Sequence, residues 1–498
     1  MTGLRQLAGQ TVIYGASSVI GRILNYVLVP LYTAVFSPAQ YGVVTELYGY
    51  VAFLNILYAY GFETSYFRFS TKDGNEDRYF NTAQSSLLIS SILFSGILIV
   101  LAEPISVLLG YEGHADHIIW LALILGIDAL VVVPFARLRL ENKAVRFASL
   151  KLINITLNIG LNVFFILFCP WWLNHQADGV VTEVIHQVYS PDIGIGYIFI
   201  SNLIANGFFL VAFFPMFVKL RIRATHEWKK MMAYAAPLII VGLASATNDM
   251  LSRVMLKYML PEGFYPNRTS LEALGIFGAC YKLSVFMTLA VQAFRYAFEP
   301  FLFSTSSDKE SPVLLKKVMT AFVIFGSFSW LLISLLLPYI APIFLQRKEY
   351  LEGIEIVPLL LGGGLFLGIF YNLSAWYKLT DKTIYGGYIT MLGAFLTIIL
   401  NIVLIPRLGY LGSSMATFVV YGVMMITSYL WGRKHYPVPY QVGRNLFYIG
   451  FAGVLIFGVY FWGGELTTRY ITITTAILLF ILVSWFLDIK YLLDPKRK

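Results

Sequence analysis

Long apolar runs separated by short polar segments are the main pattern along the chain. The stretches SSLLISSILFSGILIVLA (85–102) and ITITTAILLFILVSWFL (471–487) approach the roughly 20 residues that an α-helix needs to cross a bilayer. The whole pattern predicts an all-α polytopic membrane protein with about fourteen transmembrane helices. The predicted helices cover residues 11–36, 41–67, 83–109, 117–136, 147–170, 194–218, 231–258, 272–303, 315–338, 353–377, 384–405, 409–432, 442–462 and 469–488.

Basic residues in the polar segments indicate how these helices are oriented. When both termini are placed in the cytoplasm, most of the 36 Lys and Arg residues fall on the cytoplasmic side. Membrane proteins carry such an excess in their cytoplasmic loops. The chain is therefore expected to cross a membrane with both termini on the cytoplasmic side. The same distribution explains the net charge of +9 without nucleic acid as a partner.

The composition excludes an ordinary soluble enzyme. Hydrophobic residues make up 58% of the chain and charged residues 13%, whereas soluble chains carry about 25% charged residues. Cys169 and Cys280 lie in or beside apolar runs and suggest neither a disulfide nor a metal site. No nucleotide-binding or hydrolase motif occurs in the sequence. His114 and His117 belong to a short outer loop, GHADH, so we predict no metal, no cofactor and no enzymatic activity.

The two halves of the sequence resemble each other weakly. Three matches occur in the same order: Arg22 and Pro30 with Arg253 and Pro261, YGVVTELY (41–48) with LGIFGACY (274–281), and NVFFIL (162–167) with NIVLIP (401–406). A repeat of this kind predicts two pseudo-symmetric lobes of six helices. The predicted lobes are 1–225 and 226–436, followed by two further helices and a short basic tail in 437–498. Transporters built from such repeats place the substrate in a central cavity between them, which we expect here.

Ionisable residues inside the predicted helices are the candidate functional residues, since each costs about 2.5–3.5 kcal/mol on insertion scales. Asp249 and Arg253 lie four residues apart and share a helix face. They could neutralise each other as a structural pair, or Arg253 could bind an anionic substrate with Asp249 as a titrating partner. Arg22 has Ser18 rather than an acid four residues earlier, so self-neutralisation cannot explain Arg22. Lys282 has no partner on its own helix and is a candidate cavity cation.

Other charges in the predicted helices have different candidate roles. Arg295 and Glu299 lie four residues apart and are interpreted as a gate or structural pair. Asp128 has no basic residue within a helical turn, so it is either a neutral structural group or an ion-coupling site. Glu46 and Glu63 are candidates for pairing with cations across the cavity.

One stretch, NYVLVPLYTAVFSPAQYGVV (25–44), resembles the start of bacterial polysaccharide-biosynthesis transporters, the Wzx-type oligosaccharide flippases. That family commonly shows the pattern P-x-Y-x-x-x-x-S-P-x-x-Y-G, matched here by Pro30, Tyr32, Ser37, Pro38, Tyr41 and Gly42. A second stretch, LNIVLIPRLGYLGSSMATFVVY (400–421), looks like the corner between the family's helices 11 and 12. The broader superfamily also includes multidrug (MATE) exporters and lipid II flippases.

The resemblance implies a flippase that moves undecaprenyl-pyrophosphate-linked oligosaccharide from the inner to the outer leaflet for O-antigen, capsule or exopolysaccharide synthesis. Transport would proceed by ion-coupled alternating access. Arg22, Arg253 and Lys282 would bind the pyrophosphate headgroup, and Asp249 or Asp128 would carry the coupling ion. The expected partners are the lipid-linked oligosaccharide and membrane lipids, with a polysaccharide polymerase and its chain-length machinery as further candidates. A monomer is expected to suffice.

Three other functions remain as alternatives. A MATE-like drug exporter would favour unpaired acids over arginines in its cavity. A lipid II flippase would share the pyrophosphate chemistry. A membrane glycosyltransferase or polymerase would need catalytic residues in a sizeable outer loop, and only 170–192, with Asp178, Glu183 and Asp192, offers one.

Overall fold

A computed structural model of the chain describes residues 20–21, 23–24, 26–175, 179–221, 226–292, 294, 311–462 and 466–490. Within these residues the regular secondary structure is helical and no strand occurs. The all-α fold class predicted from the apolar runs is therefore confirmed.

Twelve helices of the described residues are long and apolar enough to cross a membrane. Large apolar side chains on them remain exposed, including Ile92, Val211 and Val454. Such exposure is unfavourable in water, whereas lipid tails are as apolar as these side chains. The twelve spans are Pro38–Asp73, Glu76–Val100, Ala115–Leu140, Ala144–His175, Gly196–Val218, Glu227–Met259, Ser270–Gln292, Pro312–Phe344, Lys348–Leu379, Ile384–His435, Val442–Tyr460 and Arg469–Asp488.

The predicted count of fourteen helices remains a prediction. Residues 11–19, 22 and 25 of the first predicted helix, 11–36, lie outside the described residues. The predicted helices 384–405 and 409–432 correspond to the two halves of α19 (Ile384–His435), which are two helices joined by a bend at Gly409.

The chain divides into two compact units, Met1–Ala246 and Thr247–Lys498. This division falls within the span Glu227–Met259, at whose start the sequence predicted the lobe boundary. In its described residues the first unit contains α2 (Leu28–Val35), α3 (Pro38–Ala59), α4 (Phe62–Asp73), α5 (Glu76–Val100), α6 (Ala102–Leu108), α7 (Ala115–Leu140), α8 (Ala144–Val163), η1 (Phe164–Phe168), α9 (Cys169–His175), α10 (Val180–Val188), η2 (Pro191–Ile193), α11 (Gly196–Val218) and α12 (His226–Ala246).

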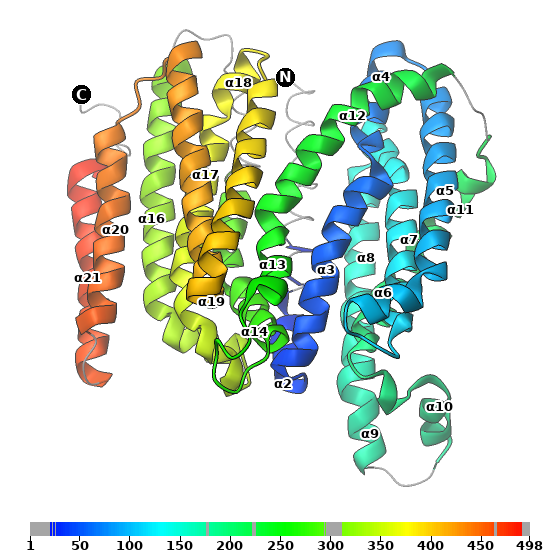
Figure 1. The fold of residues 1–498 in the computed structure, drawn as a ribbon. Helices are drawn as coiled ribbons and strands as arrows, with labels where there is room; N and C mark the ends of the chain where they lie inside the picture. The colour runs from blue at the N-terminus through cyan, green and yellow to red at the C-terminus, as the bar shows by residue number, and fades with distance from the viewer. Residues whose placement is uncertain are drawn as a thin grey trace. The chain divides into compact units, whose positions relative to one another are not determined.

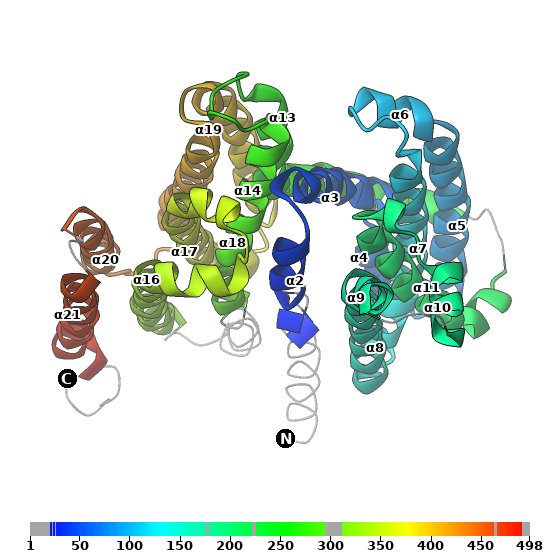
Figure 2. The ribbon, with the colours of Figure 1, turned by 90° about the horizontal axis from the view of Figure 1, so that it is seen from below.

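Helix α7 is the central helix of the first unit, since it packs against α3, α4, α5, α8 and α11 (Figures 1 and 2). Its sequence is apolar on all sides, as expected for a helix that protein surrounds. In an apolar stretch of 18 residues of α7, 61% of the residues are buried, whereas the corresponding share is 22% in the span that begins with α8. Phe62, Phe80 and Val133 form part of a buried core that joins α4, α5 and α7. Side chains on the inner face of α7 are therefore held between several helices.

The second unit is built around α17 and the long α19, which pack along each other. Helices α20 and α21 lie side by side and pack on α16 (Figures 1 and 2). In its described residues the second unit contains η3 (Thr247–Leu251), α13 (Ser252–Met259), α14 (Ser270–Leu283), α16 (Ser311–Phe344), η4 (Lys348–Ile356), α17 (Val357–Leu373), α18 (Ala375–Leu379), α19, α20 (Val442–Trp462), α21 (Leu466–Ser484) and η5 (Trp485–Ile489).

Helix α3 in the first half and helix α14 in the second half begin with the same N-terminal capping motif. Ser37 is the N-cap of α3 and exchanges hydrogen bonds with Gln40, while Pro38 occupies the first helical position. Thr269 caps α14 in the same way and exchanges hydrogen bonds with Glu272. Each capping box satisfies amide groups that the first helical turn leaves unpaired. The S-P-x-x-Y-G motif of the sequence is thus the start of a helix.

A buried asparagine occupies matching places in the two halves. Asn162 of α8 accepts a hydrogen bond from the Tyr32 hydroxyl of α2 at 2.9 Å. Asn401 of α19 donates to the Ser252 hydroxyl of α13 at 3.2 Å. Both asparagines are fully buried, and both donate to a carbonyl four residues earlier in their own helix. The match between NVFFIL and NIVLIP therefore reflects similar interhelical contacts within each unit.

The bend in α19 depends on Gly409, whose φ of +59° and ψ of −136° lie outside the helical region. Residues other than glycine rarely adopt this backbone conformation. A Cβ at this position would also collide with the ring of Tyr265. The Tyr265 hydroxyl accepts a hydrogen bond from the Tyr410 amide at 3.1 Å, which satisfies a donor released by the bend.

Candidate functional site

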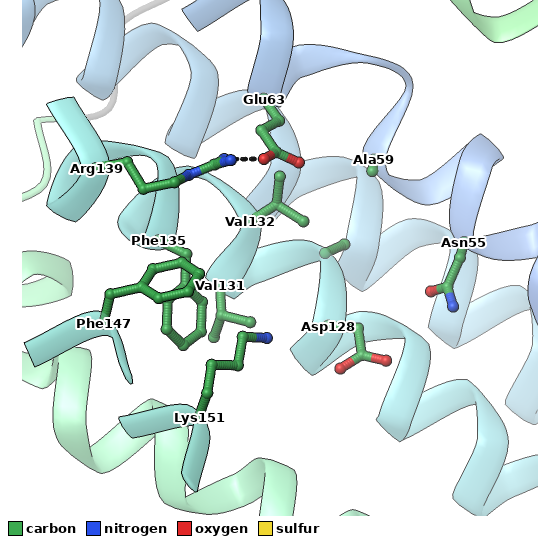
Figure 3. A pocket seen from close by; sticks show the side chains of 11 residues that line it. Asn55, Ala59, Glu63, Asp128, Val131, Val132, Phe135, Arg139, Phe147 and Lys151 are labelled. Atoms are coloured by element: carbon green, nitrogen blue, oxygen red, sulfur yellow. Dashed lines mark hydrogen bonds and ion pairs between the residues drawn. The ribbon is translucent and has the colours of Figure 1, made fainter. Parts of the chain in front are cut away.

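The first unit contains a polar cavity of about 390 Å³ between helices α3, α4, α7 and α8 (Figure 3). Four of its lining residues are charged, although they lie on helices that qualify as membrane spans. Charges at such positions are expensive and usually functional. The lining residues are Asn55, Ala59, Glu63, Asp128, Ala129, Val131, Val132, Phe135, Arg139, Phe147 and Lys151.

Glu63 and Arg139 form an ion pair at one end of this cavity, joining α4 to α7 (Figure 3). The Nε atom of Arg139 is buried and makes no hydrogen bond to the described residues. Arg139 therefore keeps a donor for a further acceptor. The sequence proposed Glu63 as the partner of a cavity cation, but did not single out Arg139.

Lys151 extends from α8 into the same cavity, and Asp128 lies beside it (Figure 3). Its Nζ atom lies 4.3 Å from the centre of the Phe135 ring and 5.3 Å from that of Phe209. Among the described residues it has no hydrogen bond and no ion pair. Aromatic faces attract a cation without consuming its N–H donors. The ammonium group is therefore held in place and still able to bind an anion.

Sequence reasoning missed Lys151 because it grouped this residue with the basic cytoplasmic loops. Helix α8 begins at Ala144, so Lys151 lies two turns inside a spanning helix. A signal was present in the spacing: Asn154, Asn158 and Asn162 follow Lys151 at intervals that place polar side chains on one helix face.

Asp128 connects the cavity to a chain of amide side chains. Its Oδ1 accepts a hydrogen bond from Asn206 Nδ2 of α11 at 2.9 Å. The Oδ1 of Asn206 in turn accepts from Asn154 Nδ2 of α8 at 3.0 Å. Asp128 thus has no basic residue within a helical turn, as the sequence indicated, but it has a polar partner, Asn206, on α11 and is linked through it to Asn154 on α8.

Glu46, the other predicted acid of this unit, lies apart from the cavity lining. It is fully buried and accepts hydrogen bonds from the hydroxyls of Tyr50, at 3.0 Å, and Tyr111. These two hydroxyl donors stabilise the carboxylate. Tyr111 belongs to the segment between α6 and α7, so Glu46 fastens that segment to α3.

In the second unit, Asp249 and Arg253 have different partners and do not pair with each other. The Oδ1 of Asp249 accepts a hydrogen bond from the Tyr421 hydroxyl of α19 at 2.6 Å. Among the described residues no ion pair joins Asp249 to Arg253. The physical reason is that residues 247–251 form a π-helical turn, whose wider spacing removes the regular alignment of positions four apart.

Arg253 lies over an aromatic ring, with its Cζ atom 4.1 Å from the centre of the Tyr281 ring of α14. Its Nε atom is buried and has no hydrogen-bond partner among the described residues. Lys282 follows Tyr281 on α14 and lies close enough to Arg253 for the two charges to interact. These contacts give the second unit a cationic group with an unused donor.

A network of buried polar side chains fixes the backbone around these charges. Asn248 donates to the Thr390 carbonyl at 3.1 Å and accepts from the Thr397 hydroxyl at 3.1 Å. One turn later, the Ser252 hydroxyl accepts from Asn401 Nδ2. These bonds tie η3 and α13 to the first half of α19, so they set the positions of Asp249 and Arg253.

Three predicted site residues, Arg22, Arg295 and Glu299, lie outside the described residues. Their assignment to the headgroup or to a gate therefore stays a prediction.

Charges at the end of α7 are paired with each other. Arg137 forms ion pairs with Glu76, Asp77 and Glu141 at 2.8–3.1 Å. Although burial opposes ionisation, hydrogen bonds from Lys143 and Arg137 lower the pKa of Glu141 below its usual value. The guanidinium of Arg137 is satisfied by acids, unlike Lys151 and Arg253, which form no ion pair among the described residues.

One group of side chains offers metal-ligand atoms. His114, Asp116 and His117, at the start of α7, each offer an atom, and these atoms lie within 4.8 Å of one another. The sequence singled out the two histidines but not the acid between them.

Solved structures similar to this chain are membrane transporters. A lipid II flippase, MurJ, in an inward closed conformation has a TM-score of 0.66 at 13% identity, and the match covers 95% of this chain and 99% of that chain. An inward-facing multidrug resistance MATE transporter of the MOP superfamily has a TM-score of 0.60 at 13% identity, covering 85% of this chain and 94% of that chain. The Vibrio cholerae MATE transporter VcmN gives a TM-score of 0.60 at 16% identity, covering 87% of this chain and 98% of that chain. At these identities the likeness shows the fold.

No curated protein sequence matches the chain significantly. A family profile described as "Polysaccharide biosynthesis protein" matches residues 7–306. Together with the twelve apolar helices of the described residues, these matches show a multi-pass membrane protein with the fold of known transporters, and the profile confirms the resemblance seen in its N-terminal motif. Since the profile spans well over half of the 498 residues, the chain belongs to the polysaccharide biosynthesis protein family.

Proposed function

We propose that this protein is a flippase for undecaprenyl-pyrophosphate-linked oligosaccharide, which it moves from the inner to the outer leaflet for surface polysaccharide synthesis. It would do so in a bacterial cytoplasmic membrane with both termini in the cytoplasm. Membership of the polysaccharide biosynthesis family supports this proposal, and so does a fold shared with a lipid II flippase.

The observation that carries the proposal is the state of Arg253. Its guanidinium lies in a spanning helix, rests on the Tyr281 ring and keeps an unpaired, buried Nε donor. A guanidinium stabilised only as a structural element would be expected to pair with the nearby carboxylate of Asp249. A pyrophosphate supplies several anionic oxygens, and arginine binds phosphate oxygens through two parallel N–H donors.

Lys151 and Arg139 extend this argument to the first unit. Their cavity offers an ammonium group and an unused Nε donor within spanning helices. The free-energy cost of exposing a pyrophosphate to hydrocarbon is prohibitive, so its path needs polar, cationic binding sites. Lys151 and Arg253 would provide one such binding site in each unit, with Arg22 and Lys282 as further headgroup ligands. Binding and release suffice for this activity, and no covalent step is needed.

Energy for the cycle would come from an ion gradient. Asp128 and Asp249 are the candidate carriers, because each is held by a neutral hydrogen-bond donor rather than by an ion pair. A carboxylate in this state can accept a proton or a cation without first losing a salt bridge. Alternating access would then couple ion release to headgroup release.

The first test is a deletion strain whose lipid-linked sugars are extracted and analysed by mass spectrometry. Accumulation of undecaprenyl-pyrophosphate oligosaccharide with loss of surface polysaccharide supports the proposal. Accumulation of lipid II would assign the lipid II flippase activity instead. Unchanged lipid-linked sugars with new sensitivity to cationic dyes would replace the proposal with drug export.

Complementation of that strain then tests the site. Arg253→Ala should abolish rescue at unchanged membrane abundance, while Arg253→Lys should restore part of it because the charge remains. Lys382→Ala removes an exposed cation and serves as the control. Full rescue by Arg253→Ala would remove the observation on which the proposal rests.

A further inference from the structure

The turn before α7 brings together side chains that the transport site does not use. His114 is the N-cap residue of α7, and Asp116 and His117 lie in its first turn. The imidazole rings of His114 and His117 are nearly parallel, at 6°, with their centres 5.1 Å apart. Since the two histidines are three residues apart, they project from the same side of the helix.

Two atoms of this cluster are buried without a hydrogen-bond partner among the described residues. They are Nδ1 of His117 and Oδ1 of Asp116. The side chain of His117 is almost completely enclosed, and its residue is only 4% exposed. Buried polar atoms are nearly always satisfied, so an unpaired nitrogen beside an unpaired carboxylate oxygen calls for a ligand.

We propose that His114, Asp116 and His117 bind a divalent transition-metal ion, for which Zn²⁺ is the best match. Neutral imidazole nitrogen and carboxylate oxygen are the ligand types that Zn²⁺ takes, and three protein ligands leave a fourth position for water. Mg²⁺ and Ca²⁺ prefer sets of oxygen ligands, which this cluster lacks. His114 is exposed, so an ion can enter from solvent.

The metal would stabilise the segment between α6 and α7. The His114 amide donates to the Tyr111 carbonyl at 3.0 Å, and the Tyr111 hydroxyl reaches Glu46 of α3. On the other side, the His117 ring packs against Phe199 of α11, with ring centres 5.3 Å apart. An ion held at this point would therefore fasten one segment to both α3 and α11. The partial positive charge at the start of α7 opposes a cation, and the carboxylate of Asp116 offsets it.

The test uses the full-length protein, purified in detergent through a tag without histidine, stripped with a chelator and titrated with Zn²⁺ by calorimetry. One equivalent should bind, and the melting temperature should rise with it. His114→Ala and Asp116→Asn should each weaken binding at least about 10-fold, since even the loss of an outer-shell partner costs 10- to 100-fold. Both positions are less enclosed than His117, which limits damage to the fold.

His186→Ala is the matched control, because it removes an exposed histidine of α10 outside the cluster. It should bind Zn²⁺ as the wild type does. The absence of a stoichiometric binding event would overturn the proposal, and so would equal affinity in the wild type and His114→Ala. Both results can be read without a transport assay, so they are independent of the flippase proposal.

Discussion

Lys151 and Arg253 are cations that lie inside membrane spans and keep hydrogen-bond donors available for an anion. Both are stabilised there in the same way. Each lies over an aromatic ring, Phe135 or Tyr281, and neither forms an ion pair among the described residues. A cation–π contact contributes about 0.5–2 kcal/mol, which reduces the desolvation cost. An ion pair would stabilise the charge as well, but it would occupy the donors that an anionic substrate needs.

Replacement of Lys151 tests whether the cavity of the first unit takes part in transport. Lys151→Ala should lower flipping in proteoliposomes about 10- to 100-fold, since a charge-assisted hydrogen bond contributes about 1.5–3 kcal/mol. Lys151→Arg should retain most activity because the charge and the ring contacts persist. Lys230→Ala, an exposed lysine of α12, is the control. Activity of Lys151→Ala equal to that of the control would remove this cavity from the pathway.

The Tyr281 ring provides a second test at the same scale. Tyr281→Phe keeps an aromatic face under Arg253 and should retain transport. Tyr281→Leu removes the face at similar volume and should reduce transport several-fold, because the guanidinium loses about 0.5–2 kcal/mol of stabilisation in its present position. Equal activities of the two variants, at equal membrane abundance, would show that the ring is only a packing surface.

At the scale of the element, the bend in α19 is the feature on which the polar network of the second unit depends. Gly409 separates the half of α19 that carries Asn401 from the half that carries Ser413. The Ser413 hydroxyl donates to Asn401 Oδ1 at 3.1 Å across this bend. A straight helix would hold these residues apart, since twelve positions correspond to about 18 Å of helix axis.

Substitution of Gly409 should therefore destabilise the second unit. Gly409→Ala forces a side chain into the left-handed region and against Tyr265, with a cost of about 1–3 kcal/mol for the backbone alone. The measurement is the melting temperature of the purified protein, which should fall by several degrees. Gly450→Ala in α20 is the control, because its Cβ would meet nothing and alanine favours a helix. A melting temperature of Gly409→Ala at or above that of the control would contradict this role.

At the scale of the whole molecule, each unit carries its own cation and its own acid. Asp128 and Asp249 belong to different units, and each accepts a hydrogen bond from a neutral side chain. In the proposed function, two such acids in one chain would allow both units to respond to the same ion gradient. The proposed coupling is therefore a property of both units together.

Asp128→Asn tests this coupling. The amide oxygen of asparagine can still accept from Asn206, so the fold should persist, but the side chain can no longer exchange a proton. Flipping in proteoliposomes should fall to the rate seen without an imposed gradient and should stop responding to pH or sodium steps. Asp192→Asn, an exposed acid outside the helical spans, should respond as the wild type does. An unchanged gradient response in Asp128→Asn would assign coupling elsewhere.

Sequence patterns predicted the fold well because membrane spans are long, apolar and bounded by charge. The boundary between the predicted helices 384–405 and 409–432 falls at Gly409, where α19 bends. Partners across helices were harder to predict. Asp249 and Arg253 share a face on a regular helix, but a single π-helical turn separates them, and no pattern of polar residues marks that turn. Lys151 was missed because its charge resembled the loop charges that orient the chain.

The π-helical turn at Thr247–Leu251 makes the register of this helix adjustable. A π turn holds one residue more than the α turn it replaces. Conversion to α geometry would advance the following residues by about 1.5 Å and rotate them by about 100°. Such a step would move Asp249 away from Tyr421 and place the side chain of a neighbouring residue there, while the helix continues across the membrane. A screw motion by one residue would therefore change whether a charged side chain faces Tyr421.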